Sequence, residues 1–409
     1  MRTSLWVIFV LALPLTAHAE MPQSFRQAFD LAWSRQGASH ALPEQRLAAA
    51  ARQVAAGAWT PAPAAIEIGG RSDRFSQNRG AAELELGLAI PLWLPGERAA
   101  GRAQAGIEAG LLEDRLAVLR WQLAGEIRAA WWAWQLAHED VLLADGELAA
   151  VQRLHDDVAR RVKAGDLARA DHYQAAAALA AAQAGQVDAG FRLAKAAAGL
   201  QALSGLVPEL PPRSLSGLVG EPLPAPQGED WLEAHPALRL HLTQAELARQ
   251  TQSLARTRSR ANPEVMLATR RERGARDESG EQSWSIGLRI PLSSGSQHAA
   301  VIADANALLI GAELALARER ERLLLAARLS QQQWQAAEQR RLASEARARL
   351  SRDSLGFFAK SFQMGETDLP TRLRVEQEAF AAERALQRAR VEQAAALSDY
   401  RQALGLLPE

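Results

Sequence analysis

An internal repeat at a fixed spacing of 200 residues constrains the fold of this chain more than any other feature. Residues 87–92 read Gly-Leu-Ala-Ile-Pro-Leu and residues 287–292 read Gly-Leu-Arg-Ile-Pro-Leu. The same spacing relates Pro63 to Pro263 and Gly205 to Gly405. An Ala-rich chain produces chance matches at Ala but not at Gly and Pro in one register, and self-similarity at a fixed spacing indicates repeated structural units. We therefore interpret the chain as a tandem duplication of one unit.

Each unit opens with a stretch in which apolar and polar residues alternate. Residues 83–90 and 284–290 carry Leu, Ile or Trp at even-numbered positions. Alternation of this length predicts a β-strand with one apolar face. A weaker alternating stretch precedes each one, at residues 64–71 and 264–271, across a polar loop that contains Gly. Each unit is therefore predicted to begin with a β-hairpin.

Each predicted hairpin is followed by a tract that favours a helix far longer than an ordinary globular helix. Residues 99–161 and 299–355 contain no Pro and are rich in Ala, Leu, Arg, Gln and Glu, a composition typical of long helices. Each tract could reach roughly 80–95 Å at the α-helical rise. Gly165 and Gly365 then interrupt the pattern, and a second helical stretch returns after each Gly. The pattern predicts two long helical hairpins.

The first residues predict export from the cytoplasm. Arg2 precedes an apolar run from Leu5 to Leu15, and Ala17-His18-Ala19 supplies a small-x-small cleavage site. This is the pattern of a bacterial secretory signal peptide, with cleavage expected after Ala19. After it we expect no helix apolar enough to cross a membrane. The chain has no Cys, so neither a disulfide nor a lipid anchor on Cys is expected.

These elements divide the chain into four segments. The segment between the two units is rich in Pro, which cannot continue a helix, and is expected to be a semi-rigid connector. The expected order is a signal peptide at 1–19, a first unit at 20–206 (hairpin about 63–91, helical hairpin about 97–205), a connector at 207–230, and a second unit at 231–409 (hairpin about 263–291, helical hairpin about 297–405).

Charge and motifs argue against other functional classes. Lys plus Arg equals Asp plus Glu at 47 each, so no basic excess predicts nucleic-acid binding. The sequence has no Gly-rich phosphate loop, no nucleophile elbow and no two-His helix motif. Adjacent groups such as His155-Asp156-Asp157 point in different directions on a helix and predict no metal site. We therefore expect neither an enzyme nor a bound cofactor.

Four strands with one apolar face cannot lie in lipid as an open sheet, because the edge groups would have no hydrogen-bond partner. Association of two copies would close eight strands around a filled interior, and three copies would close twelve around water. A soluble hairpin packed on its own helices remains an alternative. In a closed barrel the lipid-facing side chains would be Leu84, Leu86, Leu88, Trp284, Ile286 and Leu288, and the lumen side chains would be Glu83, Glu85, Ser285 and Arg289.

Several short elements carry a family resemblance. They are Ile90-Pro91-Leu92 followed by Leu94-Pro95-Gly96-Glu97-Arg98, Asn262-Pro263, the turns at Gly165 and Gly365, and the unit ends Leu203-Ser204-Gly205 and Leu404-Gly405. With the duplicated unit, they make the chain resemble the TolC-like outer membrane efflux protein family over essentially its whole mature length. The Pro-Gly-x-Arg element is most similar to the CzcC-like heavy-metal branch.

The resemblance implies a mainly α fold with a small β part, in which four strands per chain complete a trimeric twelve-stranded barrel on a periplasmic α-helical barrel. It implies an outer-membrane homotrimer that works with a periplasmic adaptor protein and an inner-membrane pump of the resistance-nodulation-division type. Heavy-metal cations are the cargo that the branch implies. Export of drugs, peptides or polysaccharide by the same channel, and a non-transporting periplasmic coiled-coil scaffold, are the alternatives.

The resemblance also implies that the two helical turns form both the gate and the adaptor-docking site. The residues concerned are Gly165, Asp166, Gly365, Glu366 and Asp368. Acidic groups repeated around a three-fold axis would attract cations, because rings of carboxylates set charge selectivity in pores. The alternative is that Asp166 and Glu366 cap the returning helices.

Overall fold

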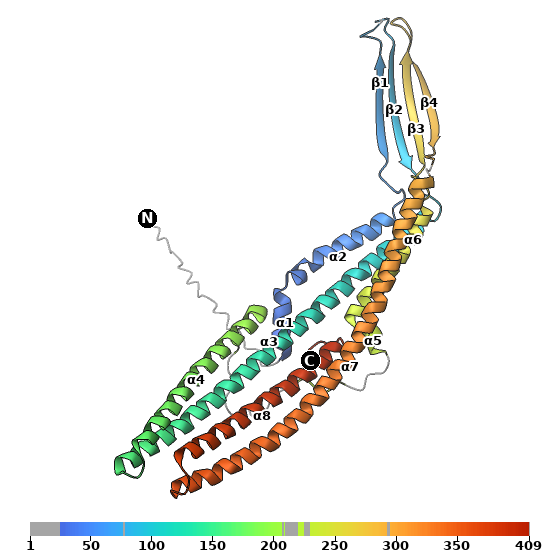
Figure 1. Ribbon diagram of the computed structural model, residues 1–409. Helices are drawn as coiled ribbons and strands as arrows, with labels where there is room; N and C mark the ends of the chain where they lie inside the picture. The colour runs from blue at the N-terminus through green and yellow to red at the C-terminus, as the bar shows by residue number, and fades with distance from the viewer. Residues whose placement is uncertain are drawn as a thin grey trace, which may run out of the picture.

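The computed structural model shows a long protein with a β-sheet at one end and paired helices at the other (Figure 1). It describes residues 25–76, 78–206, 208, 220–224, 230–292 and 295–408. The predicted signal peptide, with its cleavage after Ala19, lies outside these residues, as does most of the Pro-rich connector.

The same order of elements occurs twice along the chain. The first half holds α1 (Phe25–Arg35), α2 (Gly37–Ala56), β1 (Ala65–Ser72), β2 (Ala82–Pro91), α3 (Glu97–Ala164) and α4 (Arg169–Ser204). The second half holds α5 (Trp231–Ala234), α6 (Pro236–Thr257), β3 (Glu264–Arg273), β4 (Glu281–Arg289), α7 (Gly295–Gln363) and α8 (Leu369–Ala403). For the single chain, this confirms the expected class of a mainly helical fold with four strands.

The four strands form one antiparallel sheet in the order β1-β2-β3-β4. One row across the sheet pairs Ile68 with Leu86, Leu86 with Thr269, and Thr269 with Trp284. Residues directly opposite each other in such a ladder point to the same face. The pairing of β2 with β3 therefore joins the two halves of the chain and aligns their apolar residues on one side.

The two longest helices each exceed the tracts that the sequence marks as helical. α3 has 68 residues and α7 has 69, so each is about 100 Å long. α7 begins at Gly295 and continues through Gly356, because one Gly costs a long helix only about 1 kcal/mol. α3 packs on α4 and α7 packs on α8, which makes two helical hairpins that point away from the sheet (Figure 1).

Three substantial helices have no counterpart in the sequence expectations: α1, α2 and α6. α1 places Phe25, Ala28, Phe29 and Ala32 in the interior, at the spacing of one helical face. α2 contains Pro43, which hides a helical pattern because Pro is normally a helix breaker. α6 packs against both α3 and α7 and so bridges the two halves below the sheet.

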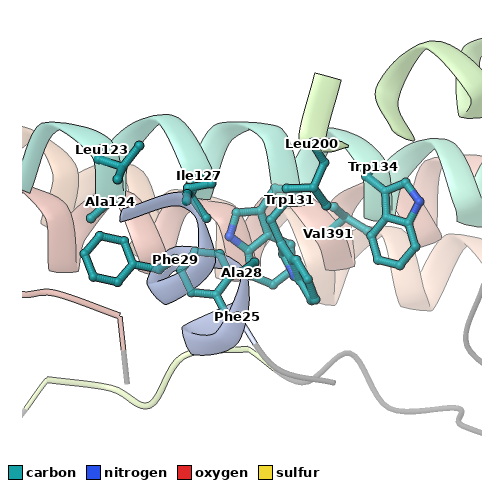
Figure 2. Close-up of a cluster of buried hydrophobic side chains, with 12 residues drawn as sticks. Phe25, Ala28, Phe29, Leu123, Ala124, Ile127, Trp131, Trp134, Leu200 and Val391 are labelled. Carbon is teal, nitrogen blue, oxygen red and sulfur yellow. The ribbon is translucent and has the colours of Figure 1, made fainter. Parts of the chain in front are cut away.

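The main hydrophobic cluster lies where α1 meets the long helices (Figure 2). Phe25 packs edge-on against Trp131 of α3, with ring centroids 5.6 Å apart. Leu200 of α4 and Val391 of α8 also belong to the cluster. Burial of aromatic side chains contributes strongly to stability, so this cluster holds α1, α3, α4 and α8 together midway along the protein.

Within the described residues, one helix is long and apolar enough to cross a membrane by length and composition. It is α7, and only 6% of its apolar stretch is buried. The expectation that no such helix follows the signal peptide is therefore wrong by this measure. The stretch lies in a segment rich in Ala, Leu and Ile with few charges, and its apolar side chains are exposed in the single chain.

Candidate functional site

The sheet has two chemically different faces. The apolar face, as we name it, consists of the even-numbered positions of β1, β2 and β4 and the odd-numbered positions of β3. It includes every residue predicted to face lipid, and these side chains are between 37% exposed, at Leu88, and 78% exposed, at Trp284. The register thus collects Leu84, Leu86, Leu88, Trp284, Ile286 and Leu288 on one uncovered surface.

The opposite face, which we name the charged face, holds all four residues predicted to line a lumen: Glu83, Glu85, Ser285 and Arg289. Within the strands it carries six carboxylates and three guanidinium groups, at Glu67, Glu83, Glu85, Glu264, Glu272, Glu281, Arg71, Arg270 and Arg289.

Ion pairs on the charged face neutralise only part of its acidity. Arg270 lies 2.9 Å from Glu83 and 3.1 Å from Glu272, and Arg289 lies 3.6 Å from Glu264. Three more carboxylates than guanidinium groups remain in each chain. A face of this charge attracts cations, more strongly where walls of low dielectric surround it.

Glu97 fixes the junction between the sheet and the helices. Its side chain is 1% exposed and accepts hydrogen bonds from Leu94 N–H at 3.1 Å, Arg258 Nε at 2.7 Å and Asn262 Nδ2 at 2.6 Å. Asn262 also donates to the carbonyl of Leu92 at 3.0 Å. One buried carboxylate therefore ties the end of β2 to the start of β3. The Pro-Gly-Glu-Arg and Asn-Pro motifs in the sequence mark these positions but do not reveal the contact.

A second buried charge network lies midway along the helices. Arg128 of α3 and Arg401 of α8 both contact the carboxylate of Glu221, and Arg401 also donates to the carbonyl of Pro222 at 2.8 Å. Burial raises the pKa of the nearby Asp399, and the charge of Arg128 opposes that rise. The sequence expectations did not include this network.

The two turns between the long helices have the same local geometry. Gly165 has φ +90° and Gly365 has φ +80°, in the left-handed region that Gly adopts without strain. The N–H groups of Asp166 and Glu366 each donate to the carbonyl five residues earlier, at 2.9 and 3.0 Å. This is the Schellman closure of a helix end, so the backbones of Asp166 and Glu366 close the turns.

The residues that cap the returning helices differ from those considered from the sequence. Asp368 begins α8 and accepts a hydrogen bond from Thr371 N–H at 3.1 Å. Hydrogen bonds from Thr371 also hold the pKa of Asp368 below its usual range. α4 begins after Ala168, whose N–H donates to Asp171 at 3.0 Å. Capping by Asp166 and Glu366 is therefore wrong, because each lies two residues before the capping position, Ala168 or Asp368.

The two turns lie at the same end of the protein, far from the sheet (Figure 1), and direct contacts join their helices. Arg161 donates from Nη1 to the carbonyl of Phe362 at 3.2 Å, and its guanidinium lies 5.1 Å from the Phe362 ring centre. Val158 and Leu369 are buried beside this contact. The structure therefore brings the five residues predicted at the turns to one end, with Arg161 as an unpredicted link.

Metal-ligating side chains do not gather in this structure. Among the residues it describes, no group of three or more His, Cys, Asp and Glu side chains could hold a metal ion. His155 contacts Asp156 at 3.2 Å and lies beside His172, with ring centroids 5.4 Å apart. Among the described residues, these side chains do not form a group that could hold a metal ion.

Comparison with known proteins places the fold. No protein-family model and no curated protein matches this sequence. Among solved structures, CusC, studied for transmembrane channel formation, matches with a TM-score of 0.78 and 16% identity over 93% of this chain and 92% of CusC. The outer-membrane channel OprN matches with a TM-score of 0.75 and 21% identity over 93% of this chain and 89% of its own. The fold is that of the solved outer-membrane channels.

The outer-membrane channel fold extends over nearly the whole chain. The outer membrane protein VceC from Vibrio cholerae also matches, with a TM-score of 0.74 and 16% identity over 94% of this chain and 97% of VceC. These likenesses confirm the TolC-like fold that the sequence resemblance implied. They are likenesses of fold, and the CzcC-like branch stays a prediction from the sequence.

Proposed function

We propose that this chain is one subunit of a homotrimeric duct in the bacterial outer membrane that extends into the periplasm and exports substrate to the exterior. The observation that carries the proposal is the two-faced sheet. Its apolar face is uncovered, and among the described residues β1 and β4 each have an unpaired outer edge. A sheet of this kind can lie in lipid only when its edges are closed by further strands.

The charge of the sheet favours three copies over two. Two copies would close eight strands around an interior filled by side chains. The charged face would then bury twelve carboxylates and six guanidinium groups, and charges without water or full pairing are costly to bury. Three copies close twelve strands around an aqueous lumen, so Glu83, Glu85, Ser285 and Arg289 can face water.

The helical part also calls for neighbouring subunits. On α7, large apolar side chains stand in solvent in the single chain: Val301, Leu308, Ile310 and Leu314. Exposed apolar side chains gathered along one stretch of a helix favour contact with another helix. Packing of α7 against the helices of a neighbouring subunit would cover these side chains and continue the barrel across the periplasm for about 100 Å.

The far end of the helices is the proposed gate and the docking site for a periplasmic adaptor protein. Gly165, Asp166, Gly365, Glu366 and Asp368 lie there, and three copies would surround the axis with nine carboxylates. Such rings set the charge selectivity of pores. An inner-membrane pump of the resistance-nodulation-division type would supply the energy. The proposed cargo is heavy-metal cations, a choice that rests on the CzcC-like resemblance.

Engineered disulfides between β1 and β4 test the barrel, because the chain has no other Cys. Within one chain, β2 and β3 separate these strands by about 14 Å, and a disulfide needs Cα atoms within about 7 Å. Glu67→Cys combined in turn with Ser283→Cys and Ser285→Cys is therefore expected to join only neighbouring subunits. The expected result is a denaturing-gel ladder that ends at three subunits, with each single-Cys variant as its control.

Single-channel conductance in planar bilayers completes the test. The trimer is expected to show stable openings, and Asp368→Asn is expected to reduce the preference for cations. A ladder that ends at two subunits would contradict the trimer. A soluble monomer without cross-links or conductance would contradict the channel and support the periplasmic scaffold.

A further inference from the structure

The apolar face of the sheet carries charge at one end only. Within the four strands, all of which the structure describes, this face holds two charged residues, Arg271 and Arg273. Arg271 pairs with Leu84 on one side and Gln282 on the other, and Arg273 pairs with Ala82. The charged face, by contrast, carries its charges along the whole strand length. Two cations on an otherwise uncharged surface call for an explanation.

The two arginines lie where the apolar band ends. Arg271 follows Val265 by six residues, which is about 20 Å along a strand. The apolar band of a membrane barrel is about 25 Å tall and is bordered by aromatic residues. Trp284 pairs with Thr269, two positions from Arg271 on the same face, as expected of an aromatic residue at the lipid interface. Because long Arg side chains extend toward the membrane interface, both guanidinium groups reach the headgroups at the loop end of the sheet.

The protein itself leaves both charges uncompensated. Glu272 lies between them in sequence but points to the charged face, where it contacts Arg270 at 3.1 Å. Arg273 donates from Nε to the carbonyl of Gly80 at 3.1 Å, a contact that orients the side chain without neutralising it. Among the described residues, neither Arg271 nor Arg273 forms an ion pair, and both are exposed.

We infer that Arg271 and Arg273 bind the phosphate groups of anionic membrane lipids that surround the loop end of the barrel. The inference rests on the proposed function, because only a sheet embedded in lipid brings headgroups to this height. A guanidinium group offers paired donors that match phosphate oxygens and binds them more strongly than neutral donors do. The apolar residues below the arginines contact the acyl chains of the same lipids, so one surface recognises both parts.

Native mass spectrometry of the detergent-solubilised trimer can test this, with diphosphoryl lipid A as the probe and phosphatidylcholine as the neutral comparison. The double variant Arg271→Gln/Arg273→Gln is expected to bind lipid A at least tenfold more weakly than wild type, with phosphatidylcholine binding unchanged. Arg71→Gln is the matched control, because Arg71 pairs with Glu83 at nearly the same height on the opposite face. It is expected to bind lipid A as wild type does.

Equal lipid A binding by wild type and the double variant would overturn the inference, as would an equal loss in Arg71→Gln. The single variants, each expected to lose about threefold if the two sites share the effect equally, provide the test if the double variant does not assemble. The β1–β4 cross-link and the conductance are measured on the same samples. Cross-linked, conducting trimers without Arg-dependent lipid binding overturn this inference alone, whereas failure of wild type to form trimers overturns the proposed function.

Discussion

Arg128 and Glu221 form a bidentate ion pair inside the protein, in which Arg128 donates from Nε to Oε2 at 2.9 Å and from Nη2 to Oε1 at 2.7 Å. Each side chain is at most 2% exposed. Arg128 belongs to α3, Glu221 to the segment between the halves, and the nearby Arg401 to α8. The pair therefore fastens the connecting segment to the first and last long helices.

Glu221→Ala is expected to destabilise the protein by about 3–5 kcal/mol, because it leaves two buried guanidinium groups without their carboxylate. Chemical denaturation followed by far-ultraviolet circular dichroism measures the loss. Arg46→Gln is the control, since it breaks the solvent-exposed pair of Arg46 with Glu113, and exposed pairs contribute little. Equal stability of the two variants would show that the buried network does not stabilise the fold.

Stability is expected to fall between about pH 6.5 and pH 4 through His235. Burial lowers the pKa of this side chain from 6.5 to about 4, an effect that Glu319 opposes and Arg322 reinforces. As the pH falls, the unfolded state takes up the proton first, so folding loses on the order of 3 kcal/mol by pH 4 and nothing above pH 6.5.

His235→Asn separates this effect from other titrations. The His235 Nδ1 accepts a hydrogen bond from Ala237 N–H at the start of α6, and Asn is also a favoured residue at a helix start. The difference in unfolding free energy between wild type and variant is expected to fall as the pH is lowered from 7 to 4. A difference that does not change with pH would contradict the assignment.

The same substitution is expected to have opposite effects at two glycines. A Cβ at Gly365 or at Gly146 would meet no atom within 4 Å, so only backbone conformation matters. Gly365 has φ +80°, and Gly365→Ala should cost about 1–2 kcal/mol. Gly146 lies within α3, and Gly146→Ala should stabilise by roughly 0.5–1 kcal/mol. Thermal unfolding of the two variants measures both changes. Shifts of the melting temperature in the same direction would contradict the prediction.

A charge in the middle of the apolar face, away from Arg271 and Arg273, is expected to prevent membrane insertion. Leu86 lies mid-strand, paired with Ile68 and Thr269, and Leu86→Arg should cost about 2–4 kcal/mol per subunit at mid-depth. Ser285→Arg, on the charged face, should insert normally. Membrane fractionation and the heat resistance of the oligomer in mild detergent distinguish them. Insertion of Leu86→Arg, or loss of insertion in Ser285→Arg, would reverse the assignment of the faces.

Local periodicity predicts the two faces of the sheet but not its assembly. Alternation alone predicts that Leu84 and Leu86 lie on the apolar face of their strand and Ile286 on that of its own, because successive side chains in a strand point to opposite sides. The pairing of β2 with β3 does not follow, since it depends on where α3 begins and where α6 ends. The contact of Glu97 with Arg258 and Asn262 sets that position, across more than 160 residues of sequence.

The buried charges could not be recognised from the sequence for a different reason. Arg128, Glu221 and Arg401 are three among 94 charged residues, and only tertiary position separates them from solvated ones. The capping residues could not be chosen from the sequence, because a cap is defined by backbone conformation. Asp166, Glu366 and Asp368 are all acidic, but Asp368 is the one at a capping position, where its backbone is extended and its side chain accepts the N–H of Thr371.

α3 is one unbroken helix, so a change in its angle at Glu97 moves its far end over a large distance. No turn or break interrupts the helix between that buried carboxylate and Gly165. Given the helical rise, a tilt of roughly 5° at the joint would displace the far end by about 9 Å. In the proposed channel, the opening formed by the turns at Gly165 would therefore change its width by several ångströms while every turn of the helix stays folded. A small change of angle at Glu97 would then suffice to control passage at the far end.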